Sequence, residues 1–260
     1  CNTVALTDAC NNVQRAVAAK SVNPALEGIC IKTTEQGIEL CGYDLEVGIT
    51  TMLDAGKAGE GGIILNAKTF CDMLRRLPAE NVTIETDDKQ RCTIKSGDTE
   101  YHITGMAQDE YPDLPYVMGG SPVVLPQAVL KNMIRQVIFA VSTDESKTVH
   151  QGVKFEIAPG HLSLIALDGY RLAIRREEVE YSGDEMTFVV PAKTLSEVIK
   201  IMDDEDGYLS LNLDGKHIVF GLNGYQIVSR LLEGHFLDYG SAIPKQFETE
   251  VKVSTRDFIE

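Results

Sequence analysis

The sequence lacks any stretch that would hold the chain in a membrane or direct it out of the cell. It contains no run of about 18 apolar residues, which a membrane-spanning helix requires. Its start has no basic segment followed by an apolar one, so no signal peptide is indicated. We therefore expect a soluble, cytoplasmic protein with no membrane partner.

The pattern expected of a metal centre is also missing. The six cysteines form no C-x-x-C pair, and no histidine precedes His102. All six cysteines lie in the first 92 residues, at Cys1, Cys10, Cys30, Cys41, Cys71 and Cys92. Four of them occupy apolar positions of predicted helices or strands. We expect reduced, buried thiols and neither a metal nor another cofactor.

Catalytic motifs are absent as well. The phosphate-binding pattern G-x-x-x-x-G-K-[ST] has only a partial match at residues 55–58, which lacks the hydroxyl residue. Paired carboxylates such as Asp87 and Asp88 fall between predicted elements, where they are usually solvated loop charges. No histidine accompanies a serine or cysteine in a nucleophile-elbow context, and we predict no catalytic residue.

What the sequence does contain is a duplication. The segments CGYDLEVGI at residues 41–49 and ALDGYRLAI at residues 166–174 resemble each other when Asp44 is aligned with Asp168, a spacing of 124. A spacing of 124 or 125 positions also separates Leu6 and Leu130, Gly28 and Gly152, Lys68 and Lys193, and Asp113 and Asp238. So long a period indicates two whole domains. Asp44 and Asp168 are the same position in both units, and we predict that they cap turns.

Each unit is predicted to run helix, strands, helix, strands. Apolar residues recur at helical spacing over residues 7–20, 67–77, 126–140 and 192–202. Thr7 or Asp8 could cap the first helix, and Asn66 the second. Alternating segments predict strands at 28–32, 37–41, 45–53, 62–65, 82–86, 92–95, 101–104, 153–157, 162–166, 172–176, 186–190, 208–213, 217–221 and 225–231.

A proline- and glycine-rich stretch predicts where the units divide. Residues 114–126 hold three prolines and two glycines and are predicted to form the linker. We expect one domain over 1–118 and a second over 119–246. Residues 251–259 resemble 123–131, so a third unit is expected to begin within 247–260, and the full-length protein should carry about one more domain.

Positive charge is concentrated on the predicted helices, although the net charge is −15. The four helices contain nine basic and three acidic residues, whereas the remainder contains 15 and 36. The nine are Arg15, Lys20, Lys68, Arg75, Arg76, Lys131, Arg135, Lys193 and Lys200. Lys131 and Arg135 are placed opposite Ile134, on the solvent face. Such a surface would contact phosphates without reading bases, because no helix-turn-helix or zinc-finger pattern occurs.

Four motifs resemble the bacterial DNA polymerase III β subunit, the sliding clamp family. They are D-G-Y-R-L-A at 168–173, V-P-A-K at 190–193, G-H-F-L-D-Y at 234–239 followed by I-P-K, and Y-P-D-L at 111–114. The resemblance covers the whole chain. It implies an α+β fold of repeated DNA-clamp domains, each with two helices packed on antiparallel sheets. The chain would hold two complete copies and the start of a third.

The resemblance implies a non-enzymatic processivity factor. Two full-length protomers would close head to tail around double-stranded DNA, and the nine basic residues would face the DNA, with Lys20 and Lys193 nearest to family positions. A hydrophobic pocket would bind peptides of the DNA polymerase III catalytic subunit, the clamp loader and other proteins with clamp-binding motifs. Its matching residues are His150, Leu167, Gly169, Tyr170, Arg171, Leu172 and Pro244. His150 and Leu167 replace a commoner leucine and threonine.

Two alternatives stay open on the sequence alone. One is a soluble, hydrolase-like α+β enzyme with a cleft between two similar domains, which turnover or a metal requirement would favour. The other is a protein-interaction scaffold that does not bind DNA. Charge reversal at the basic helix residues would leave DNA replication unchanged in that case.

Overall fold

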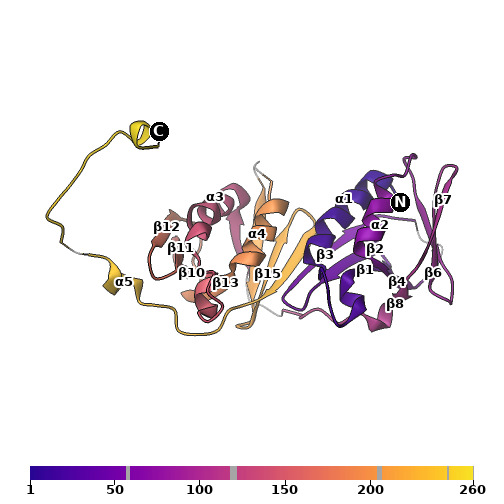
Figure 1. Ribbon diagram of the computed structural model, residues 1–260, viewed down its shortest axis with the longest axis horizontal. Coiled ribbons are helices and arrows are strands. Elements are labelled where there is room, and N and C mark those ends of the chain that lie inside the picture. The colour runs from indigo at the N-terminus through magenta and orange to yellow at the C-terminus, as the bar shows by residue number, and fades with distance from the viewer. Residues whose placement is uncertain (57–58, 118–121, 204–206, 245, 260) are drawn as a thin grey trace.

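A computed structural model describes residues 1–56, 59–117, 122–203, 207–244 and 246–259. It contains two units of the same architecture, as the duplication predicts (Figure 1). In each unit, two helices pack on antiparallel sheets, which confirms the predicted α+β fold. The predicted boundary between residues 118 and 119 lies outside the described residues.

The first unit carries its helices between two sheets. The helices are α1 (Thr3–Val13) and α2 (Ala67–Leu74). The strands are β1 (Gly28–Thr34), β2 (Gly37–Tyr43), β3 (Val47–Leu53), β4 (Gly62–Asn66), β5 (Thr83–Thr86), β6 (Arg91–Ser96), β7 (Thr99–Thr104) and β8 (Met106–Ala107). Strands β5, β6 and β7 form a separate three-stranded sheet, with β7 at one edge.

The second unit repeats this order. Its helices are α3 (Gln127–Val137) and α4 (Ala192–Ile201). Its strands are β9 (Val123–Pro126), β10 (Gly152–Ala158), β11 (His161–Leu167), β12 (Leu172–Glu178), β13 (Met186–Pro191), β14 (Tyr208–Leu213), β15 (His217–Leu222) and β16 (Tyr225–Arg230). Strands β12, β11, β10 and β13 form a four-stranded sheet, with β12 at one edge.

One nine-stranded sheet joins the two units. Its order is β8-β4-β1-β2-β3-β16-β15-β14-β9, so the units meet where β3 pairs antiparallel with β16. Ile49 lies directly opposite Ile227 at this seam, and both side chains are fully buried. Burial of an isoleucine stabilises a fold by roughly 1.5–3 kcal/mol. The seam between β3 and β16 is therefore part of the hydrophobic core.

The helices begin and end a few residues from their predicted limits. Helix α1 starts at Thr3 because the side chain of Asn2 accepts a hydrogen bond from the Ala5 N–H, so Thr7 and Asp8 are not its caps. It ends at Val13, and a 3-10 turn (Gln14–Ala16) follows. Asn66 caps α2 as predicted, accepting a hydrogen bond from the Thr69 N–H.

Part of the predicted linker is a strand. Residues 114–126 were expected to be irregular, but β9 pairs antiparallel with β14 at the end of the nine-stranded sheet. Val123 and Leu125 point into the core and are almost fully buried. The alternation of these two apolar residues decides the local structure despite the neighbouring prolines.

Asp44 and Asp168 cap equivalent turns, as predicted. Asp44 Oδ1 accepts hydrogen bonds from the backbone N–H groups of Glu46 and Val47, at 3.0 and 2.8 Å. Asp168 Oδ1 does the same for Tyr170 and Arg171, at 2.9 and 3.1 Å. Each carboxylate thus satisfies two donors in the turn before an outgoing strand.

The cysteines are free thiols, as expected. Five are buried and Cys1 is half-buried. Burial raises the pKa of the Cys41 thiol to about 12 and that of the Cys30 thiol to about 11. The neighbouring Cys71 of α2 and burial raise the pKa of the Cys10 thiol of α1. These thiols behave as small apolar core residues.

The chain leaves the second unit through an exposed segment. Two short helices occur there, α5 (Tyr239–Ala242) and α6 (Thr255–Ile259), and the intervening chain extends away from the sheets (Figure 1). Helix α6 begins at the residue that the repeat aligns with the first residue of α3. In the part of the chain that the structure describes, no helix is long and apolar enough to span a membrane.

Candidate nucleic-acid interface and partner site

Eight of the nine predicted DNA-facing residues are exposed. They lie on or just after the four main helices of the two units (Figure 1). They are Arg15, Lys20, Lys68, Arg75, Arg76, Arg135, Lys193 and Lys200. The faces that these helices turn toward the core carry apolar residues instead, such as Phe70 and Leu195, which are fully buried.

Lys131 is the exception, and the prediction of a solvent-facing side chain was wrong. Only 6% of Lys131 is exposed, and its Nζ donates a hydrogen bond to the carbonyl oxygen of Met202 at 2.7 Å. The end of α4 therefore covers the face of α3 on which this lysine lies. Arg135, one turn later, is exposed as predicted.

Four predicted helix residues lie beyond the α-helices: Arg15 stands in the 3-10 turn after α1, and three others lie outside any helix. Lys20 follows the 3-10 turn that ends at Ala16. Arg75 is the C-cap of α2, and Arg76 comes after it. A cation at this end of a helix interacts favourably with the helix dipole. All three side chains remain exposed, although their positions are less rigidly fixed by helix geometry than predicted.

Two of the basic residues connect the units. Lys193 Nζ of α4 lies 2.7 Å from Asp44 Oδ2 and 3.1 Å from Glu46 Oε2, both in the turn before β3. Arg15 Nη1 lies 3.6 Å from Glu197 Oε2 of α4. The role of Asp44 in its turn was predicted from the sequence, but its ion pair across the seam was not. The duplication relates Lys193 to Lys68, but it does not indicate that Lys193 pairs with an acidic residue.

The seam favours the charged form of Lys193. Partial burial opposes the charge, but the hydrogen bonds and negative charges of Asp44 and Glu46 outweigh it and raise the pKa of the ammonium group. The ion pair is exposed to solvent, and such pairs contribute at most about 1 kcal/mol. It therefore adjusts how the units meet, whereas β3 and β16 hold them together.

The other basic residues divide into paired and unpaired groups. Arg75 pairs with Asp72 at 2.8 Å, and Lys200 pairs with Glu197 at 2.7 Å. Lys20, Lys68, Arg76 and Arg135 have no carboxylate partner among the described residues. These four can bind an external phosphate without first breaking an ion pair.

The predicted pocket residues gather around the turn between β11 and β12. Leu167 ends β11 and is buried, Leu172 begins β12 and is half-buried. Gly169 has a φ of 99°, a backbone conformation that would be strained for a residue with a side chain. Tyr170 is 98% exposed at the tip of this turn, and Arg171 Nε lies 2.8 Å from Asp168 Oδ2. Tyr170 and Arg171 thus belong to the turn between the strands predicted at 162–166 and 172–176.

His150 lies beside this turn, against the segment that follows β16. Its ring meets that of Phe236 edge to face, with centroids 5.0 Å apart. Burial and the nearby Lys147 lower the pKa of the imidazole, so its neutral form is favoured. Lys147 also lies next to Gly169, so residues 147–150 bridge the turn and the chain near Phe236.

Pro244 is not enclosed with the other six residues. It follows α5 in the exposed segment that leaves the second unit (Figure 1). Tyr170 and Pro244 are both open to solvent. The turn between β11 and β12 is therefore exposed, with the buried Leu167 and half-buried Leu172 at its base, and Pro244 lies outside it.

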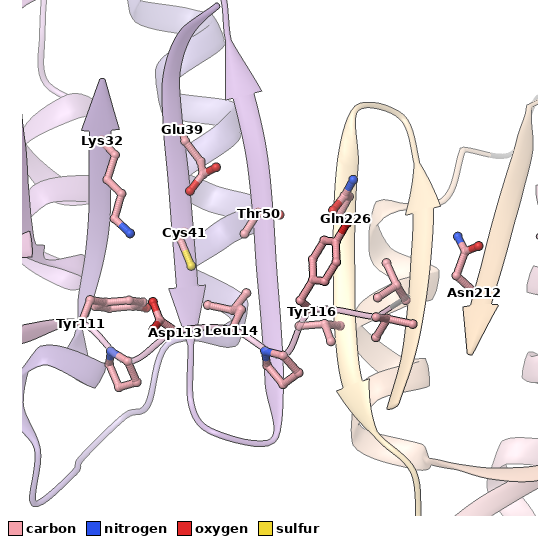
Figure 2. Close-up of a pocket in the computed structure, with 15 residues that line it drawn as sticks. Lys32, Glu39, Cys41, Thr50, Tyr111, Asp113, Leu114, Tyr116, Asn212 and Gln226 are labelled. Carbon is pink, nitrogen blue, oxygen red and sulfur yellow. The ribbon is translucent and has the colours of Figure 1, made fainter. Parts of the chain in front are cut away.

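A separate cavity of about 370 Å³ lies where the two units meet. Figure 2 shows the connector from Tyr111 to Tyr116 crossing the outer face of the nine-stranded sheet, with Thr50 and Gln226 on either side of the seam. Leu114 packs against Gly48 and Val228 there. On the sequence alone, the Y-P-D-L segment at 111–114 was a motif of the family resemblance, with no contact across the units predicted for it. The described residues contain no group of three or more His, Cys, Asp or Glu side chains that could bind a metal.

Comparisons with known families match both units. The model of the DNA polymerase III beta subunit, N-terminal domain, matches residues 1–115. The model of the DNA polymerase III beta subunit, central domain, matches residues 124–238. The two matches follow the division into units that the duplication predicts.

Individual relatives agree with the family match. The beta sliding clamp of Halalkalibacterium halodurans is 36% identical over 96% of this chain and 69% of its own length. That of Bacillus subtilis is 31% identical, over 98% of this chain and 70% of its own length. The crystal structure of the B. subtilis clamp matches with a TM-score of 0.94 at 30% identity, covering 99% of this chain and 70% of that one. A putative DNA polymerase III beta subunit from Eubacterium rectale gives 0.92 at 34% identity, with 95% and 68% covered.

Proposed function

Because the chain belongs to the DNA polymerase III beta subunit family of sliding clamps, which are not enzymes, we propose that it encircles duplex DNA as part of a ring and tethers a replicative polymerase. This family membership removes the hydrolase-like alternative. The proposal concerns what the ring encloses and which partners it holds.

The distribution of exposed positive charge is the observation that carries the proposal. Eight basic residues are exposed on or beside the four main helices, while the chain as a whole has a net charge of −15. Helices of both units contribute, so the positive surface would continue from one unit to the next. Contacts to phosphates alone are independent of sequence, which suits a protein that slides.

The turn after β11 supports the partner site. Tyr170 is an exposed aromatic residue beside the half-buried Leu172, and exposed aromatic residues are typical anchors of protein interfaces. We assign this turn and His150 to the binding of short peptides from the polymerase, the clamp loader and other partners.

The first experiment compares retention on circular and linear DNA. The protein is loaded on nicked circular duplex by a bacterial clamp loader, and half of the sample is then linearised. A clamp stays on the circles and leaves through the ends of the linear molecules. Equal loss from both would disprove encirclement and would favour the DNA-independent scaffold.

Charge reversal tests the assigned surface. Lys68→Glu with Arg135→Glu should shorten retention on circles and reduce the salt dependence of DNA binding by about one unit of slope per lost phosphate contact. Lys89→Glu with Lys216→Glu, in exposed turns between strands, is the matched control and should leave both quantities unchanged.

Peptide binding tests the partner site independently of DNA. A fluorescent peptide carrying a clamp-binding motif should lose affinity for Tyr170→Ala, because truncation removes an interface anchor. Tyr208→Ala removes a tyrosine that is 67% exposed on β14 and should have no effect. Equal effects of the two substitutions would exclude the turn as the binding site.

A further inference from the structure

The cavity where the two units meet has no part in the functions assigned so far. It has a volume of about 370 Å³ and lies on the outer face of the nine-stranded sheet, against the connector from Tyr111 to Val117 (Figure 2). Its lining residues are distinct from the turn between β11 and β12 and from the basic residues on the helices. Ligand sites occur preferentially between domains. The cavity could therefore hold a ligand independently of both other surfaces.

The cavity is elongated across the sheet. Its lining runs over six neighbouring strands, from Lys32 on β1 through Thr50 on β3 to Asn212 on β14. Neighbouring strands lie about 4.8 Å apart, so these six strands span about 24 Å. An extended chain rises about 3.4 Å per residue, and about seven residues would cover this length. The shape therefore suits an extended peptide better than a compact molecule.

The connector forms one wall of the cavity and is anchored at two points. The Tyr111 side chain is buried, and its hydroxyl donates a hydrogen bond to the carbonyl oxygen of Gly28 at 3.4 Å. Leu114 packs against Gly48 and Val228 at the seam. The wall is thus fixed before any ligand arrives, which reduces the entropy lost on binding.

Several polar side chains of the cavity lack partners. Lys32 and Glu39 are directly opposed on β1 and β2, and both are half-buried. Neither side chain forms an ion pair or a hydrogen bond among the described residues. The same holds for the side chains of Thr50, Asn212 and Gln226, which line the cavity on the other strands. A peptide main chain laid across them would supply N–H and C=O groups that match their hydroxyl and amide groups.

The corresponding place in the second unit is closed by its own side chains. The spacing of 124 puts Glu156 where the first unit has Lys32. Lys154 Nζ lies 2.6 Å from Glu156 Oε1, and the Tyr239 hydroxyl donates a hydrogen bond to Glu156 Oε2 at 2.8 Å. Tyr239 corresponds to Leu114 of the first connector, which has no hydroxyl group. The first unit therefore leaves open polar groups that the second unit satisfies within itself.

We propose that this cavity binds an extended segment of about seven residues from a partner protein. The end of the cavity at β1 and β2 carries one basic and two acidic side chains, those of Lys32, Glu39 and Asp113 (Figure 2). The segment therefore places a basic side chain at this end, and Lys32 donates to a main-chain carbonyl oxygen. Val228 and Val219 line the cavity on β16 and β15, so aliphatic side chains follow there.

Tyr116 provides a further contact for such a segment. Its side chain is 84% exposed and points from the connector toward β16 (Figure 2). Exposed aromatic residues are typical anchors of protein interfaces. The site goes beyond the proposed clamp function, since it requires neither DNA nor the turn after β11, and its binding can be measured by itself.

Selection from a peptide library gives the direct test. Random heptapeptides displayed on phage are selected on the 260-residue chain, with an excess of a clamp-binding peptide to occupy the turn after β11. Enriched peptides should carry a basic residue near one end and aliphatic residues beside it. Fluorescence polarisation should show that Glu39→Lys weakens their binding about tenfold, because like charges then meet. Glu35→Lys, in the exposed turn of the same hairpin, is the matched control and should leave the affinity unchanged.

Charge exchange separates recognition from misfolding. A peptide whose basic residue is replaced by glutamate should bind Glu39→Lys more tightly than it binds the wild type, because opposite charges meet again. Circular dichroism establishes that the variants are folded. No enriched peptide, or enriched peptides that bind Glu39→Lys as tightly as the wild type, would overturn the proposal.

Filling the cavity tests its position. Val219→Trp places a large side chain in the cavity and should reduce the affinity for the selected peptides at least tenfold. Val124→Trp makes the same exchange at an exposed position of β9, outside the lining, and should have no effect. Tyr170→Ala should also bind these peptides as the wild type does, and a loss there would assign them to the turn after β11 and overturn the seam site. If the peptides bind at the seam but the protein leaves circular and linear DNA equally fast, the seam site stands and the clamp function fails.

Discussion

The two units have the same fold but differ in what pairs with β3 in the first unit and with its equivalent, β12, in the second. In the first unit, β3 is completed by β16, and Asp44 binds Lys193 from the neighbouring unit. In the second, the equivalent strand β12 is an edge, and the equivalent Asp168 binds Arg171 of its own turn. The turn carboxylate is needed in both places. Its second oxygen binds Lys193 of the neighbouring unit in the first turn and Arg171 of its own turn in the second.

The composition of the two strands follows this difference. β3 carries uncharged residues at the seam, including Gly48, where an added Cβ would clash with Leu114 and Val228. β12 carries two arginines and two glutamates after Ile174. Charged side chains on an edge strand oppose indiscriminate pairing with other edges.

The largest expected effect on the free energy of unfolding comes from giving β3 a residue that β12 carries at the equivalent position. Ile49→Ala introduces the residue type that β12 carries at Ala173. It removes a fully buried side chain opposite Ile227 and should lower the free energy of unfolding by about 2–5 kcal/mol. Urea unfolding followed by circular dichroism measures this change. Ile174→Ala, on the partly exposed β12, is the control, and an equally large loss there would contradict the distinction between the strands.

A smaller loss of stability should follow from removing either of the equivalent turn carboxylates, Asp44 or Asp168. Asp168→Ala leaves the backbone N–H groups of Tyr170 and Arg171 without their acceptor and should cost about 1–2 kcal/mol. Asp44→Ala should cost a similar amount, because its hydrogen bonds in the turn are the same. Asp98→Ala, in an exposed turn, is the comparison. A loss of stability for only one of the two substitutions would show that the two aspartates do not stabilise their turns equally.

The free energy of unfolding at acid pH should depend on the carboxylate of Asp168. Hydrogen bonds from the Tyr170 N–H and the Arg171 side chain lower the pKa of Asp168 in the folded state. A group whose pKa is lowered by folding stabilises the protein above its unfolded pKa, and this contribution is lost as the pH falls through the folded value. We expect wild-type stability to decline below about pH 4. Asp168→Asn should decline less steeply there, and an unchanged slope would exclude this carboxylate as a contributor.

Much of the fold could be predicted because its determinants are local. Alternation of apolar residues gave the β1–β2 hairpin, and Asn66 marked the start of α2. The role of Asp44 in its turn also depends on residues two and three positions away. Such signals lie within a few residues of the feature that they specify.

The errors concern contacts between distant segments. Strand β9 exists because β14, more than 80 positions later, supplies its hydrogen-bonding partner. Lys131 was placed on the solvent face because the helical pattern of α3 does not show that the end of α4 covers it. The pairing of Lys193 with Asp44 joins residues 149 positions apart. Neither spacing nor charge alone identifies such partners.

The smallest effect should come from the ion pair across the seam. Lys193→Ala removes an exposed pair and should lower the free energy of unfolding by about 0.2–1 kcal/mol at low ionic strength. The loss should disappear in about 1 M salt, because the Debye length then shrinks to about 3 Å. Lys200→Ala removes a pair within α4 and serves as the control for helix propensity. A loss for Lys193→Ala above 2 kcal/mol that persists in salt would mean that the ion pair, and not the isoleucines beneath it, holds the units together.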